Sequence, residues 1–353
     1  MTPSVSRACI PGLPGLVLAL LTAACASAPP QATLVEETRV AMGSSLRIAV
    51  WTSQREAATA ALARAFDEMA RLESLLTVWR TSSDVSRLNA AAGSGIPVEV
   101  SADTASVLGT ALEAGRATGG TFDVTFGALS DLWRFDHDQD NTVPSAEAIA
   151  ARPPLIDFTR VHVDHAAQRA WIDTPDVRVH LGGIGKGYAV DRVAALLRGA
   201  GFSDFLIQGG GDLYAAGHPG ARAWRVGIQD PRGTPDDLFA TIEVENETVS
   251  TSGDYERFFE HNGVRYHHLI DPHTGWPATS VRSVTIVAPT AVDADWLSTG
   301  VFIMGPERGL ALVESLPGVG AVLVTATGEL RVSERLRDRV RVDHAPRTDA
   351  PAR

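Results

Sequence analysis

A glycine-rich segment constrains this chain more than any other part of its sequence. Residues 181–188 read LGGIGKGY, and the apolar spacing that follows predicts a helix over residues 187–198. Glycines let backbone groups approach a ligand closely, and a helix N-terminus binds anions, so this turn is suited to a phosphate. Lys186, the only lysine of the chain, would add a compact positive charge there. A purely structural turn is the alternative, because the segment matches neither the P-loop nor the dinucleotide-binding fingerprint.

The other patterns predict an α+β fold with one large domain. A chain of 353 residues with 44% hydrophobic residues can bury a substantial core, and no internal linker divides it. Helical spacing predicts helices over residues 55–76, 102–117, 187–198, 294–304 and 307–315. Extended patterns predict strands within 34–51, a hairpin over 160–181 turning at 164–168, and strands at 205–208, 224–229, 239–244, 265–270, 283–288 and 320–325. Residues 136–154 are expected to form a loop with at most a short helix.

The first residues are typical of an export signal. Arg7 precedes an apolar run over residues 13–21, and small residues then lead to Cys25. We interpret residues 1–24 as a signal peptide and residues 25–33 as a tether lipidated at Cys25, although Thr22 stands where a lipobox usually has leucine. A signal peptide cleaved elsewhere, releasing an unanchored protein, is the alternative. The apolar run is too short for a transmembrane helix. The domain is then expected to span residues 34–340, with a disordered tail over 341–353.

The net charge argues against nucleic-acid binding. The chain carries −11 at neutral pH, and a protein that binds DNA or RNA non-specifically depends on excess positive charge. We therefore expect no nucleic-acid partner.

Asp295 and Thr299 form a candidate metal site. They are four residues apart in a predicted helix, so they share one face and could offer two oxygen ligands to a hard cation such as Mg²⁺. The alternative is an aspartate that favours the helix dipole and a threonine that bonds to its own backbone.

His267 and His268 form the other candidate for chemistry. In an extended segment they face opposite sides, so only one of them can point inward, where a histidine could act as a general base. A structural histidine is the alternative. Trp79 and residues 121–125 are ambiguous in the same way, since a tryptophan can belong to a core or stack on a flat ring.

Together these segments resemble those of the ApbE-type FAD:protein FMN transferases, a family that often consists of periplasmic lipoproteins. The resemblance covers nearly the whole mature chain, with the segments in family order. They are residues 41–44, the Trp79, Ser86 and Asn89 stretch, and residues 120–125, 132–135, 181–191, 210–212, 250–255, 268–275 and 294–299. The resemblance implies an ApbE-like, T-fold-related domain of mixed sheets flanked by helices.

The resemblance also implies a role for each matching position. Asp295 and Thr299 would bind Mg²⁺ through their side chains and Gly183 through its carbonyl, while Lys186 would lie beside the flavin nucleotide and its pyrophosphate. His268 would lie near the reacting phosphate, where we expect it to act as the base. The remaining positions expected to contact FAD are Met42, Trp79, Thr121, Phe122, Asp123 and His180.

The chain departs from the family at a few positions. The family usually has an aspartate that contacts FAD where this chain has His180, which could weaken or alter FAD binding. Gly185 replaces a common alanine and His273 a common basic residue.

The implied activity is Mg²⁺-dependent transfer of FMN from FAD to a threonine or serine of an exported or membrane redox protein, with release of AMP. The enzyme would be anchored by its lipid on the periplasmic side of the inner membrane. The sequence leaves two alternatives open. One is hydrolysis of FAD to FMN and AMP by water in the same site, and the other is a lipoprotein that binds FAD without turnover.

Overall fold

The computed structural model describes residues 1–4 and 31–348, and it divides the chain into two units, Met1–Gln31 and Ala32–Arg353. The predicted signal peptide and Cys25 lie outside the described residues except for residues 1–4. Within the described residues, no helix has both the length and the apolar character needed to cross a membrane. The second unit contains all the helices and strands discussed below.

An eight-stranded antiparallel sheet forms the centre of the second unit. Its order is β1-β2-β6-β7-β10-β13-β14-β15, so the strands that meet in its middle are far apart in the sequence. The strands are β1 (Thr33–Ala41), β2 (Ser44–Thr52), β6 (Phe205–Gly209), β7 (Asp212–Ala216), β10 (Glu247–Gly253), β13 (Val281–Ala288), β14 (Gly320–Thr325) and β15 (Leu330–Val332).

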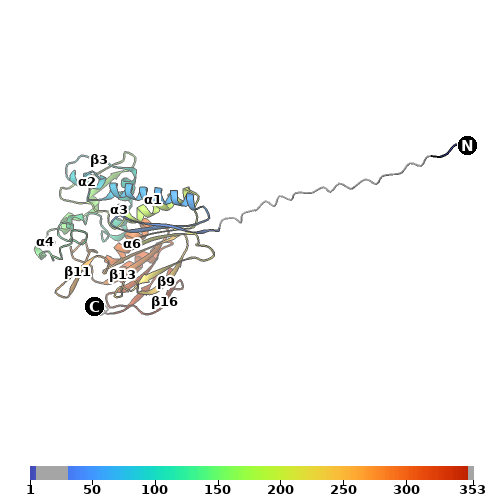
Figure 1. Ribbon diagram of the computed structural model, residues 1–353. Helices are drawn as coiled ribbons and strands as arrows, with labels where there is room; N and C mark the ends of the chain where they lie inside the picture. The colour runs from blue at the N-terminus through green and yellow to red at the C-terminus, as the bar shows by residue number, and fades with distance from the viewer. Residues whose placement is uncertain (5–30, 349–353) are drawn as a thin grey trace. The chain divides into compact units, whose positions relative to one another are not determined.

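Helices cover one face of this sheet. α1, α5 and α6 pack on it, with α5 in contact with both other helices, and Figure 1 shows α1, α3 and α6 on the side of the sheet away from β9 and β16. The helices are α1 (Arg55–Leu76), α2 (Asp84–Ala90), α3 (Ala102–Thr118), α4 (Ala146–Ala150), α5 (Gly185–Gly199), α6 (Ala291–Met304) and α7 (Pro306–Ser315). Short 3₁₀ turns lie at Gly127–Leu129, Pro153–Leu155, Phe158–Arg160 and Glu334–Leu336.

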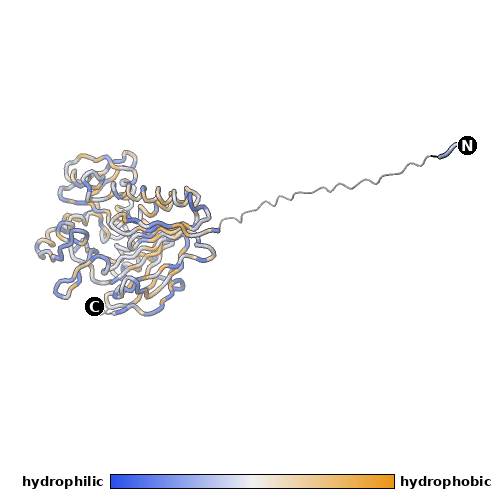
Figure 2. Tube along the Cα trace, in the orientation of Figure 1, coloured by the Kyte–Doolittle hydropathy of each residue, from blue (hydrophilic) through white to orange (hydrophobic). Residues whose placement is uncertain are grey.

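A second, three-stranded sheet covers the opposite face. Its order is β16 (Val340–Val342), β9 (Leu238–Val244) and β8 (Trp224–Gln229), and its apolar side chains share a core with those of the large sheet. Two smaller sheets pair β3 (Val98–Glu99), β5 (Arg169–Ile172) and β4 (Val161–Asp164), and β11 (Phe258–His261) with β12 (Val264–His267). Figure 2 shows hydrophobic residues along the central strands and hydrophilic residues in the outer loops. The α+β fold and the single large domain are thus confirmed.

Several predicted boundaries were wrong. Residues 341–348 are not a disordered tail, because β16 pairs with β9 and the backbone N–H of Arg347 donates to Asp230. The hairpin ends at Ile172, and the strand predicted to reach residue 270 ends at His267. Thr33, assigned to the tether, opens β1. The helix predicted from residue 187 begins two residues earlier, at Gly185, within the glycine-rich segment.

The central strand β10 was not predicted. Its sequence, ETVSTSG, has no alternation of apolar and polar residues, because Ser250 and Ser252 are buried beneath α6 instead of facing solvent. The short helix α2 was also missed. It is stabilised locally by Ser83, whose hydroxyl accepts from the backbone N–H of Ser86.

Candidate active site

A cavity of about 1500 Å³ opens beside the helix-covered face of the large sheet. Its wall combines the β1–β2 turn, the end of α1, the segment that follows α3, the glycine-rich segment, β10, α6 and the loop after β12. All the residues predicted as site residues line this one cavity. They are Met42, Trp79, Thr121, Phe122, Asp123, His180, Gly183, Lys186, His268, Asp295 and Thr299.

Three charged residues form a buried ion cluster in the cavity wall: Lys186, Asp212 and Asp295. Lys186 Nζ lies 2.5 Å from Asp212 Oδ2 and 3.7 Å from Asp295 Oδ1. The two carboxylate side chains are 3% and 4% exposed, whereas the lysine is 26% exposed to the cavity. Burial alone would lower the pKa of Lys186, but Asp212 and Asp295 outweigh it and raise that pKa, so the lysine stays charged. The cluster therefore contains one fixed cation between two carboxyl groups.

Asp295 is held by the close packing of α5 and α6. The backbone N–H of Gly187 donates to Asp295 Oδ2 at 2.8 Å. A Cβ atom on Gly187 would lie 2.2 Å from the carbonyl oxygen of Ala291, so only glycine lets the two helices approach this closely. Asp191 supports the same junction, since it accepts from the backbone N–H groups of Ala291 and Val292 at the start of α6.

The charge of Asp295 is incompletely compensated. Burial and the neighbouring charge of Asp212 raise its pKa to about 7, against the opposing effect of Lys186 and the Gly187 N–H. One of its oxygens, Oδ1, is 3.7 Å from the lysine, beyond hydrogen-bond length. A cation bound at this oxygen would favour the ionised carboxylate.

Hydroxyl groups lie next to the cluster. Ser250 Oγ–H donates to Asp212 Oδ1 at 2.5 Å, and Ser252 Oγ is 2.9 Å from Ser298 Oγ and 3.4 Å from Thr299 Oγ1. The backbone of Gly183 also lies near Thr299, because a Cβ atom at Gly183 would be 3.4 Å from Thr299 Oγ1.

These neighbours supply only oxygen donors, the kind that Mg²⁺ prefers. Among the described residues, no group of three or more His, Cys, Asp or Glu side chains could hold a metal by itself. A divalent cation would therefore need the mixed set of Asp295, Thr299 and the Gly183 carbonyl, and this set fits its chemistry.

The two adjacent histidines occupy different environments. His267 is buried, and its Nε2 lies 2.9 Å from the carbonyl oxygen of Ala278, whereas His268 lines the cavity. The backbone N–H of His268 donates to the carbonyl of Arg257 at 3.1 Å, and its Nδ1 lies 3.3 Å from the same oxygen. If Nδ1 carries the proton, Nε2 is left as an acceptor.

The pKa of His268 lies well below its usual value. Burial is the main cause, and the positive charge of Arg257 and the neighbouring His267 act in the same direction. The imidazole is therefore neutral at physiological pH, the state a general base requires.

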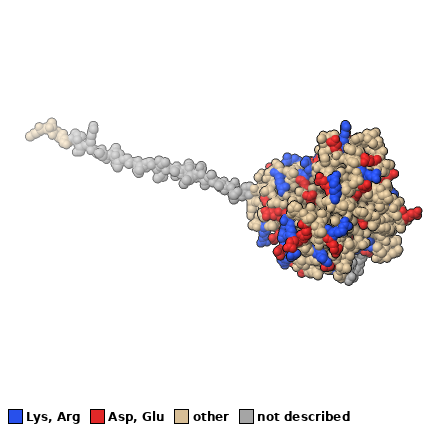
Figure 3. Space-filling model, turned by 180° about the vertical axis from the view of Figure 1, so that it is seen from behind, with Lys and Arg blue, Asp and Glu red and all other residues tan. Residues whose placement is uncertain are grey.

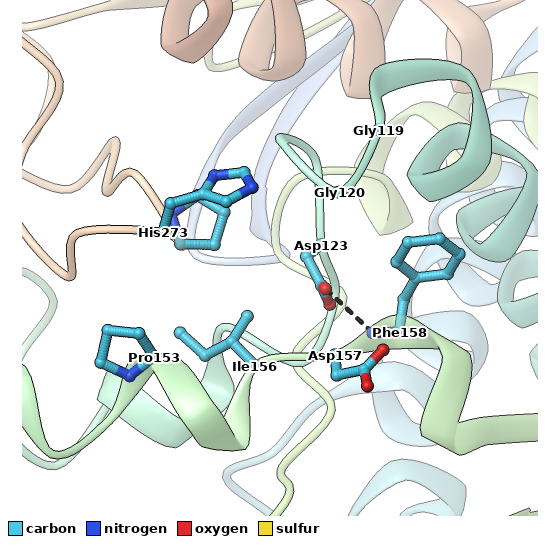
Figure 4. Close-up of a pocket in the computed structure, with 9 residues that line it drawn as sticks. Gly119, Gly120, Asp123, Pro153, Ile156, Asp157, Phe158 and His273 are labelled. Atoms are coloured by element: carbon cyan, nitrogen blue, oxygen red, sulfur yellow. Dashed lines mark hydrogen bonds between the residues drawn. The ribbon is translucent and has the colours of Figure 1, made fainter.

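Asp123 is fully engaged by its own surroundings. Its Oδ1 accepts from the backbone N–H and the hydroxyl of Thr125 at 2.8 and 2.6 Å, and its Oδ2 accepts from the backbone N–H of Phe158 at 2.9 Å. Asp123 also lines a smaller pocket of about 360 Å³ beside His273, shown in Figure 4 with the bond to Phe158 dashed. Its carboxylate thus joins two segments that form the cavity wall.

His180 supports the glycine-rich segment. Its Nδ1 accepts from the backbone N–H of Gly182 at 3.1 Å, and its own backbone N–H donates to the carbonyl of Val124 at 2.7 Å. Burial lowers the pKa of His180, so it presents a neutral ring where an aspartate would present a charge.

Met42 and Trp79 are the two remaining predicted FAD contacts in the cavity wall. Met42 has a φ of +50° in the tight β1–β2 turn, and Trp79 is 56% exposed with its ring 4.6 Å from that of His137. A flat exposed ring of this kind can stack on a planar ligand.

Comparison with known proteins agrees with this geometry. The ApbE family model matches residues 42–338. The chain belongs to the ApbE family. The FAD:protein FMN transferase of Treponema pallidum (strain Nichols) is 37% identical over 321 residues, which cover 85% of this chain and 87% of that protein. The protein of the same name from Escherichia coli (strain K12) is 34% identical over 262 residues, 73% of this chain and 74% of that protein.

Solved structures of ApbE proteins have the same fold. The ApbE protein of Thermotoga maritima superposes with a TM-score of 0.78 at 34% identity, covering 87% of this chain and 99% of that chain. The flavin transferase ApbE of Vibrio cholerae gives a TM-score of 0.77 at 27% identity, with coverage of 87% and 99%.

Sequence reasoning missed several residues of this ApbE site. Asp212 was noticed as part of the Gly210–Asp212 turn but received no role, and Ser250, Glu256, Arg257 and Asp136 received none either. Asp212 follows a glycine pair at a turn between strands, which was the available signal. Arg257 and Asp136 have no local pattern, because only the fold brings their loops together.

Proposed function

We propose that the chain is an Mg²⁺-dependent FAD:protein FMN transferase, which attaches FMN through a phosphoester bond to a threonine or serine of an acceptor protein and releases AMP. Its relatives of that name, each similar over most of its length, support this activity. The cavity of about 1500 Å³ exceeds the usual size of small-ligand pockets, roughly 300–1,000 Å³, and suits a dinucleotide.

The reaction replaces one phosphorus–oxygen bond by another. The acceptor hydroxyl attacks the phosphorus on the FMN side of the diphosphate, and the bond from this phosphorus to the bridging oxygen breaks. FMN is then esterified to the acceptor, and the bridging oxygen leaves as part of AMP. The hydroxyl proton passes to Nε2 of His268, which is neutral in the free protein.

The chain must also reduce the negative charge of the diphosphate, which repels a nucleophile. Lys186 lies at the cavity surface with its charge secured by two carboxylates. Asp295, Thr299 and the Gly183 carbonyl would hold Mg²⁺, which supplies Lewis-acid stabilisation of the charge that develops on the phosphate oxygens.

The observation that carries the proposal is the buried ion cluster itself. It places Lys186, an under-compensated carboxylate and several hydroxyl groups in the wall of one large cavity that His268 also lines. A cavity that only stored FAD would not need a cation-binding carboxylate of raised pKa, so the cluster favours turnover.

The experiment is chromatography of FAD incubated with the protein and Mg²⁺, with and without an acceptor domain. The transferase predicts AMP release that depends on the acceptor and equals the FMN bound to it. AMP and free FMN at the same rate without an acceptor would identify a hydrolase, and FAD that persists with both present would identify a binding protein.

We further propose that the protein acts as a lipoprotein on the periplasmic side of the inner membrane, where exported redox proteins would be its acceptors. The support is the apolar leader that ends at Cys25. Replacement of Cys25 by Ser should abolish labelling by fatty acid and release the protein from membranes. Membrane association that survives the replacement would contradict the anchor.

A further inference from the structure

An exposed ion pair, Asp136–Arg257, lies at the cavity and is called the rim pair below. Arg257 belongs to the turn between β10 and β11, and Asp136 to the loop between the 3₁₀ turn Gly127–Leu129 and α4. Arg257 Nη1 donates to Asp136 Oδ1 at 2.6 Å, and both residues line the cavity. Their side chains are 44% and 37% exposed, in contrast to the carboxylates of the buried ion cluster.

The backbone of Arg257 is tied to the expected base. Its carbonyl oxygen accepts from the backbone N–H of His268 and lies 3.3 Å from Nδ1 of that ring. The guanidinium is therefore attached to the same part of the wall as His268. Its positive charge also acts on Lys186, since it is among the influences that lower the pKa of that lysine.

Arg152, Arg178 and Arg257 all line the cavity in partly exposed ion pairs, and Arg257 is the one whose backbone carbonyl contacts His268. Lys186 is paired with Asp212 and Asp295, so it offsets only part of the negative charge of an incoming diphosphate. Exposed ion pairs contribute only about 0–1 kcal/mol, so Arg257 can leave Asp136 at small cost. A guanidinium can bind a phosphate through two parallel hydrogen bonds, whereas Arg257 makes one to Asp136.

We propose that Arg257 exchanges Asp136 for the diphosphate of FAD when substrate binds, which makes Arg257 a residue that selects a flavin dinucleotide over unphosphorylated flavin. Asp136 is then the competing counter-ion of the free enzyme. This inference rests on the proposed function, because it takes FAD as the substrate.

The test is equilibrium titration of the full protein with FAD, and in parallel with riboflavin, followed by flavin fluorescence. Arg257→Gln should weaken FAD binding about tenfold or more, because a charge-assisted hydrogen bond is lost, and should change riboflavin binding by less than about twofold. Asp136→Asn should strengthen FAD binding by about two- to fivefold, since the arginine is released. The double variant should bind FAD like Arg257→Gln, because removal of Asp136 helps only when Arg257 is present.

A merely structural role for the rim pair predicts a different pattern. If the pair only holds the loop in place, both single variants weaken FAD and riboflavin binding together, and that result would overturn the inference. Arg134→Gln is the matched control, because Arg134 forms an exposed ion pair with Asp140 in the same loop but does not line the cavity. Arg134→Gln should leave FAD affinity unchanged. If it weakens FAD binding as much as Arg257→Gln does, loss of any positive charge in this region explains the effect, and that result would also overturn the inference.

The same experiments distinguish failure of this inference from failure of the proposed function. If the wild-type protein releases AMP from FAD but Arg257→Gln and Asp136→Asn change FAD affinity in the same direction, only the role of Arg257 is contradicted. A wild-type protein that binds no FAD contradicts both.

Discussion

The buried ion cluster and the rim pair place the same kinds of charge in two different settings of one cavity. In the cluster, Lys186, Asp212 and Asp295 are fixed by the ends of a helix, a strand and a second helix, with the carboxylates almost inaccessible. In the rim pair, Asp136 and Arg257 meet from two loops in partial contact with solvent. Breaking a buried pair by removing one partner costs about 3–5 kcal/mol, whereas an exposed pair contributes about 0–1 kcal/mol.

The difference teaches that exposure, not charge type, separates a fixed site from an exchangeable one. The cluster can keep a catalytic geometry because the packing of the helices fixes the positions of its side-chain atoms. The rim pair can exchange partners because breaking its exposed ion pair costs little free energy. Charged residues of both signs are also interspersed over the face of the protein seen in Figure 3, which shows no basic patch on that face.

The largest expected effect comes from the cluster. Asp295→Asn should lower FMN transfer by about 10³-fold or more, because the carboxylate needed for cation binding and charge stabilisation is lost. FAD binding and the folded state should persist, since the amide keeps the size of the side chain. The measurement is single-turnover AMP release with saturating Mg²⁺. A variant that transfers FMN as fast as the wild type would show that Asp295 holds no catalytic cation.

The next effect tests whether helix packing fixes the cluster. Gly187→Ala should lower the free energy of unfolding by about 1–3 kcal/mol, because its methyl group would overlap the carbonyl of Ala291. Transfer should fall roughly 100-fold, since a shift of α6 displaces Asp295. Denaturant unfolding and AMP release measure the two quantities.

Gly199→Ala is the matched control for this variant. It lies in the same helix, where an added Cβ atom meets nothing within 4 Å, so stability and transfer should be retained. Equal losses in both variants would contradict the packing argument.

A smaller effect is expected at Trp79, the exposed aromatic residue of the cavity wall. Trp79→Ala should weaken FAD binding by about tenfold or less, the value of one aromatic stack, and change stability by less than about 0.5 kcal/mol because the ring is exposed. Trp133→Ala is the contrast: it is 5% exposed and its Nε1–H donates to Gly275, so stability should fall by about 3–5 kcal/mol. Unchanged FAD affinity in the Trp79 variant would remove the ring from the binding site.

The smallest expected effect is that of Arg257, in the rim pair, on the pKa of His268, the expected base. The pKa of His268 is lowered by burial, Arg257, His267 and Lys186, against the raising effect of the Arg257 carbonyl, so the neutral base persists below its usual pKa. With saturating Mg²⁺, which would keep Asp295 ionised despite its raised pKa, transfer should be constant as pH falls to about 6.5, the unperturbed histidine pKa, and decline only at lower pH. In Arg257→Gln one positive charge is gone, so this decline should begin at higher pH. The pH–rate profile of single-turnover AMP release measures this shift. A decline that begins at lower pH in Arg257→Gln would contradict the expected effect of Arg257 on the pKa of His268.

Much of the fold could be predicted because its elements have strong local patterns. α1 and β8 begin and end at the predicted residues, since one has a clear helical spacing and the other a compact extended run. β10 could not be predicted, because its buried serines are satisfied by α6 and by Asp212 on the adjacent strand. The polar residues of β10 find their hydrogen-bond partners only in the assembled sheet.

The candidate site shows the same limit. The predicted residues line one cavity. Spacing and residue pattern indicated Lys186, His268 and the Asp295–Thr299 pair only as separate candidates, and their assembly into one FAD site came from the family resemblance. The partners within the cluster depend on register: Asp212 lies directly opposite Ser250 because β7 and β10 pair in that alignment. The rim pair depends on two loops that are 121 residues apart. Pairings of this kind have no sequence period and become visible only in three dimensions.

The central claim is that the cavity transfers FMN to a protein hydroxyl. The most direct measurement is mass spectrometry of an exported acceptor domain co-expressed with the wild-type protein or with Asp295→Asn. We predict an acceptor that carries one FMN on a threonine or serine with the wild-type protein and none with the variant. An acceptor that stays unmodified while the wild-type protein cleaves FAD to FMN and AMP would contradict it.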